Sequence, residues 1–439
     1  MYRKATREWW KHVLWFSRVK LIYARITLTP FTTLYFFLAL LGCIVLVILQ
    51  SMTYSGNFDG ASAVSTLLSK SNVTTATAGL SFLSDGDVLL CQNIPRQPGA
   101  NCSVLVHHAH AHMHVRDTTF LLDPAAPSGS PTDPDGPSYQ CAVSLLWLGD
   151  VLADATREDL AVLAYQIWLF SLSMVTLLNE SLPHLFAGLA ARVLGTAWAG
   201  FRVQGNINLY DTYLHVINTG PCNGFDPMGT WWNQSGAHEI ATLVSNAVNL
   251  AAMAALSYKL FKVYSVATFS RVGASKEINR VYKLVLLLSV TLQLAGFFTL
   301  VQTGLWVSKI SFGGIRTLAE DFPMYLAALV VTVVLELPWL ILGWTTVRRE
   351  QRKRFLVFCV ISLILLLMST LMFASPLYRF VLSSWSFYAT MTVTAYALLV
   401  ATSALAVVCR LQFGKGLAHF CNYPIPFSSL LYTHSSQCA

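Results

Sequence analysis

Five histidines crowd into eight residues, written His107-His108-Ala-His110-Ala-His112-Met-His114. In a β-strand, residues two apart share a face with a backbone spacing of about 6.5 to 7 Å. This register aligns four imidazoles, those of His108, His110, His112 and His114. Neutral imidazole suits Zn(II) and Cu(II), so the pattern predicts a weak metal site. The alternative is a surface strand that binds nothing, and we expect no other cofactor.

A single carboxylate interrupts a long apolar segment, YLAALVVTVVLELPWLILGW, in which Glu336 is followed by Pro338. An ionised carboxylate deep in a bilayer is costly, so Glu336 must face protein or water, or stay protonated. Its expected partners are four amides on other apolar segments, Asn246, Asn249, Gln293 and Gln302. One interpretation is a proton or cation site in a carrier. The other is a neutral glutamic acid that holds helices together.

Polar and aromatic residues also accumulate between Asn206 and Trp232. Such a stretch caps a helical bundle or forms the mouth of a ligand site. Trp231 and Trp232 are also typical of the aromatic belt at a membrane interface. The sequence contains no HExxH, GxSxG, P-loop, CxxC or helix-opening GxGxxG motif, so we expect no enzymatic activity.

Composition defines the class of protein that must position these residues. Hydrophobic residues make up 55% of the 439 residues, charged residues 11%, and the mean hydropathy is +0.55. Soluble domains contain roughly 25% charged residues. These values exclude a soluble enzyme, a disordered chain, a coiled coil and a nucleic-acid-binding module. They predict a protein whose main partners are membrane lipids.

Apolar runs long enough to cross a bilayer divide the chain. A span needs roughly 20 apolar helical residues, and six such runs stand out, at 31–50, 240–260, 282–307, 323–345, 355–374 and 386–409. The fold class expected from them is an all-α multi-pass membrane helical bundle with six spans. Five of these spans form a compact bundle over 240–409.

Basic residues predict how the bundle is oriented. If 1–30 is cytosolic and six spans alternate, the cytosolic pieces hold 20 of the 29 Lys and Arg residues, in agreement with the positive-inside rule. Both termini are then cytosolic, with 410–439 as a tail. Segment 1–30 carries seven basic residues. It is expected to form an interfacial helix on an anionic leaflet, or only to set the orientation of the first span as its positive flank.

The segment 51–239 is expected to be a large mixed outer domain between the first two spans. It contains fifteen acidic and six basic residues. All four glycosylation sequons of the chain lie in it, at Asn72, Asn101, Asn179 and Asn233. Four of the nine cysteines also lie there, Cys91, Cys102, Cys141 and Cys222. They predict two disulfides in one of three connectivities, and hence a glycosylated, disulfide-bonded ectodomain.

A hydrophobic helix pair at 160–203 leaves the number of spans open. The run 160–178 has no charge, and 183–203 is amphipathic. We favour two buried helices of the outer domain, because Glu180, His184 and Arg192 are costly in lipid. The alternative is a hairpin that crosses twice, which gives eight spans and leaves Asn179 unglycosylated.

Two stretches carry a family resemblance. They are WLFSLSMVTLLNESLPHLFAGLAARVLGTAWAGF, from Trp168 to Phe201, and RVGASKEINRVYKLVLLLSVTLQLAGFF. Both are similar to an uncharacterised family of multi-pass membrane proteins from mushroom-forming fungi, and the similarity extends over about the last two thirds of the chain. Because that family has no known activity, the resemblance implies a membrane location and nothing more.

The sequence therefore favours a non-enzymatic surface sensor or receptor-like protein whose outer domain binds an extracellular ligand or protein partner. Its expected location is the plasma membrane or another membrane of the secretory pathway. The alternative is a secondary carrier or channel for a proton- or cation-coupled small solute, with Glu336 in its site.

Overall fold

Helices make up most of the chain in the computed structural model. It describes residues 22–71, 79–84, 87–95, 100–106, 139–272, 276–311, 315–318, 322–348 and 351–412, together with residues 20, 73 and 97. The interfacial helix expected within 1–30, the histidine strand at 107–114, Asn72 and most of the tail 410–439 lie largely or wholly outside these residues.

The described chain contains eight long helices, two short helices, three strands and one π-helical turn. In order they are α2 (Pro30–Lys70), β1 (Leu80–Ser84), β2 (Asp87–Cys91), β3 (Cys102–Val106), α4 (Tyr139–Asn179), α5 (Leu182–Thr212), η1 (Tyr213–Asn218), α6 (Trp231–Val272), α7 (Lys276–Ser311), α8 (Ile315–Leu318), α9 (Phe322–Arg348), α10 (Arg352–Ala374), α11 (Pro376–Ser384) and α12 (Ser386–Leu411).

The predicted helical membrane bundle is confirmed at this level. Among the described residues, seven helices are long and apolar enough to cross a membrane, namely α2, α4, α6, α7, α9, α10 and α12. All six predicted apolar runs fall in helices of this set. At the start of α2, Thr29 caps the helix by accepting from the backbone N–H of Thr32, and Pro30 occupies the first turn, where its missing N–H costs nothing.

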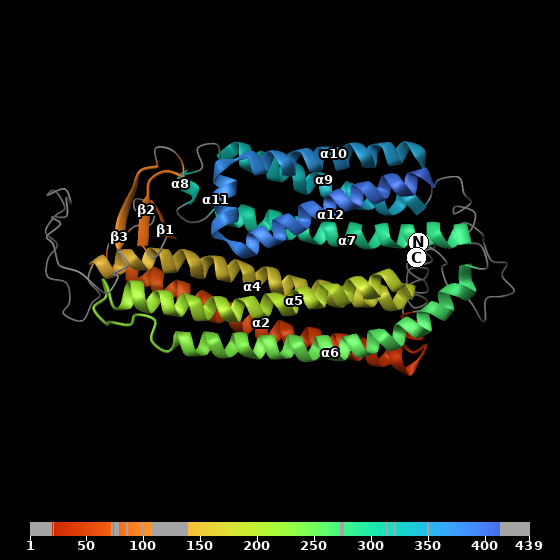
Figure 1. Ribbon diagram of the computed structural model, residues 1–439, viewed down its shortest axis with the longest axis horizontal. Coiled ribbons are helices and arrows are strands. Elements are labelled where there is room, and N and C mark those ends of the chain that lie inside the picture. Colours follow the sequence, from red (N-terminus) through yellow and green to blue (C-terminus); the bar gives the residue numbers. More distant parts are fainter. Residues whose placement is uncertain are drawn as a thin grey trace, which may run out of the picture.

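Two groups of four helices lie side by side (Figure 1). The first half of the bundle contains α2, α4, α5 and α6, which pack on one another. The second half contains α7, α9, α10 and α12. The halves meet where α4 and α5 pack against α7.

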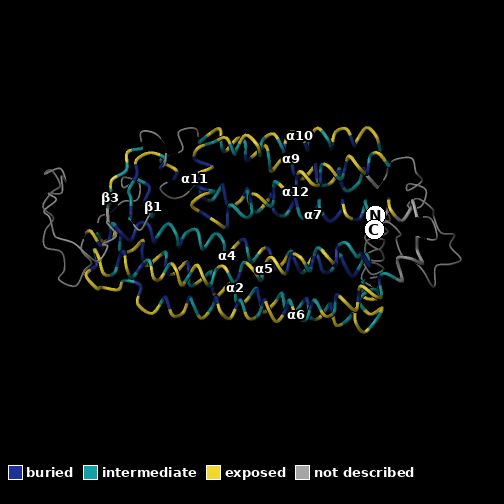
Figure 2. Tube along the Cα trace, in the orientation of Figure 1, coloured by how far each residue is buried: buried dark blue, intermediate teal, exposed yellow. Residues whose placement is uncertain are grey.

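The outward faces of the bundle are strongly apolar. On α10, Leu356 and Leu363 are each 67% exposed, and Ile341 on α9 and Val248 on α6 are exposed by 63% and 65% (Figure 2). Soluble monomers rarely expose contiguous apolar surface of this extent. Such faces match the hydrocarbon of a bilayer.

A small antiparallel sheet in the order β1-β2-β3 covers one end of both halves (Figure 1). A disulfide between Cys91 and Cys102 joins β2 to β3. Phe82 packs edge-on against Phe380 of α11, with ring centroids 5.8 Å apart, while Val88 belongs to the core that includes Val64 of α2. The sheet thus contacts the first half on one side and the second half on the other. We call this the sheet end of the bundle.

A second disulfide, Cys141 to Cys222, ties the start of α4 to the segment that follows η1 at the same end. The two predicted disulfides are therefore present. Tyr213 of η1 donates a hydrogen bond to Asp226 Oδ1 at 2.7 Å. Burial, reinforced by the neighbouring carboxylate, raises the pKa of Tyr213.

The expected outer domain at 51–239 is not a separate unit among the described residues. Helix α2 continues through this boundary to Lys70, and α4 and α5 lie along α2 and α6 for most of their length (Figure 1). The hydrophobic pair predicted at 160–203 is thus built into the first half of the bundle.

The three polar residues that were expected to keep this helix pair out of the bundle have hydrogen-bond or ion-pair partners in the structure. Glu180 forms an ion pair with Arg25, His184 Nδ1 shares a hydrogen bond with Ser181 at 2.7 Å, and Arg192 donates to Ser173 at 3.0 Å. Each bond removes part of the cost of burying a polar group. Because Arg25 precedes α2, its pairing with Glu180 also places the turn between α4 and α5 beside the start of α2, at the end opposite the sheet.

Loss of the Cys141–Cys222 bond should lower stability. The two cysteines are 81 positions apart, and the chain-entropy model assigns roughly 4 to 5 kcal/mol to closing a loop of that length. We expect the Cys141→Ala, Cys222→Ala double variant to melt well below the native protein in detergent. Cys359→Ala, which removes an unpaired cysteine of α10, is the control. Equal melting temperatures for both variants would contradict the prediction.

Candidate functional site

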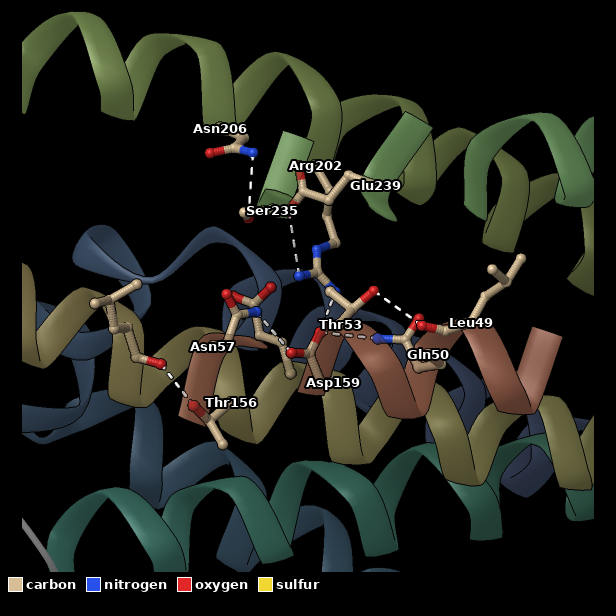
Figure 3. A network of polar contacts seen from close by, with 12 residues as sticks. Leu49, Gln50, Thr53, Asn57, Thr156, Asp159, Arg202, Asn206, Ser235 and Glu239 are labelled. Atoms are coloured by element: carbon tan, nitrogen blue, oxygen red, sulfur yellow. Dashed lines mark hydrogen bonds and ion pairs between the residues drawn. The ribbon is translucent and has the colours of Figure 1, made fainter. Parts of the chain in front are cut away.

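A carboxylate with no exposed surface lies at the centre of the first half of the bundle. Asp159 of α4 is 0% exposed. Its Oδ1 accepts from Gln50 Nε2 at 2.8 Å, and its Oδ2 accepts from Asn57 Nδ2 at 2.7 Å, both from α2. Arg202 of α5 completes the set as an ion-pair partner (Figure 3). A buried charge of this kind is tolerated only with such compensation.

Arg202 is shared between two carboxylates. Its Nη1 binds Asp159, and its Nη2 reaches Glu239 Oε1 of α6 at 3.4 Å (Figure 3). Nearby, Asn206 Nδ2 lies 3.4 Å from Ser235 Oγ, a second polar contact between α5 and α6. One network therefore joins all four helices of the first half.

Further charges extend the network to the second half. Asp154 of α4 binds Arg157 on its own helix and Lys309 of α7, each at 2.5 Å. Arg157 also donates to Ser308 at 3.0 Å. At the start of α12, Trp385 Nε1 donates to Glu158 Oε1 at 2.6 Å. Polar bonds therefore join the halves on the side of the sheet end.

The network carries more acids than bases. Its formal cations are Arg157, Arg202 and Lys309, and its carboxyl groups are Asp150, Asp154, Glu158, Asp159 and Glu239. Five carboxyl groups therefore face three formal cations. Partly buried charges are screened only weakly by salt, so this composition favours a cation over an anion beside the network.

The charged layer lies at the edge of the apolar belt. Gln50, Asp159 and Glu239 border the apolar runs of their helices, 31–50, 160–178 and 240–260. The remaining parts of α2, α4 and α6 extend from this layer to the sheet end.

A cavity of about 500 Å³ opens beside the network between the two halves. Its charged lining residues are three acids, Asp154, Glu158 and Glu239, and one base, Arg202. Its aromatic walls come from Trp198, Phe201, Trp231 and Trp385. A cation over an aromatic face is attracted by the ring quadrupole. Acidic and aromatic lining together suit a small organic cation.

Stacked aromatic rings fill the interface between the halves on the far side of the charged layer. Trp168 of α4 stacks on Phe297 of α7 at 4.6 Å, and Tyr165 contacts Phe297 at 5.6 Å and Phe298 at 6.4 Å. Beyond them lies an apolar groove of about 550 Å³ between α4, α7 and α9, lined by Trp168, Leu292, Gly296 and Leu340 among others. The aromatic layer separates this groove from the acidic cavity.

The structure does not gather the polar site predicted around Glu336. Asn246 and Asn249 belong to α6, which packs on α2 and α5, whereas α9 packs on α10 and α7. Asn246 donates to Thr242 O on its own helix. Glu336 is 1% exposed, and neither of its carboxyl oxygens has a hydrogen-bond partner among the residues that the structure describes.

The other predicted residues have separate positions. Gln293 lines the apolar groove, and Gln302 lies nine residues further along α7, half-buried. Asn206 and Trp231, from the polar stretch expected to form a ligand mouth, do line the acidic cavity. In the part of the chain that the structure describes, no three His, Cys, Asp or Glu side chains gather as metal ligands.

The charged network itself was missed in the sequence, although one signal points to it. Asp150, Asp154 and Glu158 recur every four residues and so share one face of a helix. That face is informative only if the helix extends from 139 to 179. The hydrophobic helix predicted from the sequence begins at residue 160 and does not include these acids.

Comparisons with protein-family models, with curated proteins and with solved structures found no match. The candidate site therefore stands on its own geometry.

Asp159→Asn should destabilise the protein strongly. The change removes the charge that pairs with Arg202 while keeping the shape of the side chain. Loss of one partner of a buried ion pair costs about 3 to 5 kcal/mol, which denaturation in mixed micelles would measure. The control is Asp59→Asn, which alters an exposed carboxylate on α2. If the two variants lose equal stability, Asp159 does not hold the network.

Proposed function

We propose that the protein is an eight-span membrane carrier for small organic cations. Helix α5, at 31 residues, extends about 46 Å at 1.5 Å per residue, more than the roughly 30 Å of hydrocarbon. Its outward side chains are apolar, with Phe186 56% and Val193 51% exposed. Its arginines face partners inside the bundle. Counting α5 with the seven apolar helices gives eight crossings.

Eight crossings keep the predicted orientation. The basic segments at 1–30, 259–283 and 346–354 still fall on one side of the membrane, together with the turn at Glu180. The sheet, both disulfides and Asn101 fall on the other side, where an oxidising compartment allows disulfides. In this orientation the acidic cavity lies on the outer side.

One observation carries the proposed substrate class. The cavity between the halves is lined by three carboxyl groups against one arginine, in a network where carboxyl groups outnumber formal cations. A bound cation would pair with carboxyl oxygens that the arginine does not reach. Trp198, Trp231 and Trp385 give the same site apolar walls, so the cation is organic.

The arrangement of the halves supports transport rather than sensing alone. Voids lie between the same two halves on both sides of the aromatic layer. Rocking of one half against the other is a common way to expose a fixed site alternately. The sensor interpretation depended on a separate ectodomain, and the described part of 51–239 belongs to the bundle instead.

Glu336 has a place in this proposal as a proton site. It lies in the second half, away from the acidic cavity, and has no partner for either carboxyl oxygen. Such a group is stable in an apolar bundle only in its protonated form. A carboxyl that takes up and releases a proton would couple transport to a proton gradient.

Glycan mapping tests the number of spans. Asn101 is exposed at the sheet end, whereas Asn179 ends α4 at the opposite end. We expect Asn101→Gln to remove a glycan-dependent gel shift from protein expressed in a eukaryotic cell. Asn179→Gln should leave the shift unchanged. A glycan on Asn179 would place that turn outside and rule out the eight-span topology.

Transport assays with matched probes test the substrate class. Four compounds share one phenyl tail and differ in the head group: 2-phenylethylamine, trimethyl(2-phenylethyl)ammonium, 2-phenylethanol and 3-phenylpropionate. In proteoliposomes containing the full chain, we expect uptake of at least one of the two cations and none of the neutral or anionic compounds.

Variants link that uptake to the cavity. Glu239→Gln should lower uptake of the cation by about tenfold, the effect of losing one charged hydrogen-bond partner. Asp59→Asn is the matched control on an exposed carboxylate. Cation binding to the purified protein without any uptake would favour a receptor and overturn the carrier. Uptake of the neutral or anionic compound at the same rate would overturn the substrate class.

A further inference from the structure

A chamber too small for most solutes adjoins the acidic cavity. Its volume is about 20 Å³, and a void needs roughly 10 to 15 Å³ to accept one water-sized group. Trp198, Arg202 and Glu239 line both the chamber and the cavity. The chamber extends past Arg202 into the apolar belt, where Val162 and Gln166 of α4 and Thr242 of α6 line it.

Two buried oxygen atoms at the chamber have no hydrogen-bond partner among the described residues, and neither does the indole N–H of Trp198. The oxygens are Glu239 Oε2 and Thr242 Oγ1, one helical turn apart on α6, in residues that are each only 9% exposed. Arg202 reaches the other oxygen of Glu239 and is already committed to Asp159, and Asn206 contacts the same carboxyl group. A buried acceptor without a close donor costs free energy, so a further donor at these two oxygens would be stabilising.

A small cation rich in N–H groups suits this place, because carboxyl groups outnumber bases in the lining of the adjoining cavity. A primary ammonium group has three N–H donors and is close to water in size. A trimethylammonium group has the same charge, but it has no N–H and carries three methyl groups. Space for one water-sized group admits the first and excludes the second.

We propose that the chamber binds the ammonium group of a primary amine whose carbon tail lies in the acidic cavity. The ammonium donates to Glu239 Oε2 and Thr242 Oγ1, beside the indole of Trp198. The tail lies among Phe201, Trp231 and Trp385. Trp231 Nε1 is bonded to Gly56 O at 2.7 Å and Trp385 Nε1 to Glu158, which holds both rings in place. This proposal rests on the proposed function, because it names the head group that the cation site selects.

Two of the matched cations test this selection directly. We would measure binding of 2-phenylethylamine and trimethyl(2-phenylethyl)ammonium to the full chain in lipid nanodiscs by calorimetry. The expected result is that the primary amine binds at least about tenfold more tightly, because it alone donates hydrogen bonds to the buried oxygens. Equal binding, or tighter binding of the trimethyl compound, overturns the chamber as the head-group site and leaves the cation carrier standing. Binding of neither cation overturns both proposals.

A nearly isosteric variant isolates the chamber. Thr242→Val removes the unpartnered hydroxyl and keeps a side chain of similar shape. We expect it to weaken binding of the primary amine several-fold and leave binding of the trimethyl compound unchanged. Thr66→Val, which alters an exposed threonine bonded to Ser62 O on α2, is the matched control. If Thr242→Val leaves the ratio of the two affinities unchanged, the ammonium group does not occupy the chamber.

Discussion

Burial of the Asp159 carboxylate is the constraint on which the first half of the bundle depends. A charge with no exposed surface needs several donors at once, and Gln50, Asn57 and Arg202 supply them from two other helices. Arg202 in turn needs its own position fixed, and Glu239 of α6 contributes to that. The register of α2, α4, α5 and α6 is therefore set by polar geometry, since apolar packing alone is tolerant of sliding in lipid.

The same constraint produces the cavity. Side chains that must reach a common point keep their helices apart on either side of it, and aromatic residues fill part of the gap. Between the halves, bonds such as Lys309–Asp154 and Trp385–Glu158 hold the side towards the sheet, while the stacked rings of Trp168 and Phe297 hold the middle. Polar bonds exchange readily with water or a charged solute, whereas stacked rings move as a unit. The interface therefore has a polar side next to the acidic cavity and a closely packed aromatic layer beyond it.

The sequence predicts the parts of this fold that depend on local composition. Runs of apolar residues identified six helices, and the number of cysteines in one segment identified two disulfides. Both features can be recognised from the composition of the sequence alone. It assigned the helix pair at 160–203 to an outer domain, because Glu180, His184 and Arg192 looked too polar for lipid, whereas α4 and α5 pack in the first half of the bundle. Their partners are local for His184 but come from a distant segment for Glu180, 155 residues away from Arg25. Such pairing is a property of the assembled helices, so periodicity and composition do not reveal it. The acidic network was hidden for the same reason.

One arginine between two buried carboxylates cannot satisfy both. Arg202 lies within ion-pair range of Asp159 and only 3.4 Å from Glu239 Oε1, which leaves Glu239 Oε2 without a donor in the described structure. The unpaired oxygen therefore follows from how the helices are held together. A cation that binds there completes the network and should stabilise the first half of the bundle in proportion to its affinity, since a ligand that binds only the folded state adds its binding free energy to folding. The interaction that fixes the helices therefore also leaves the acceptor oxygen with which the proposed cation would pair.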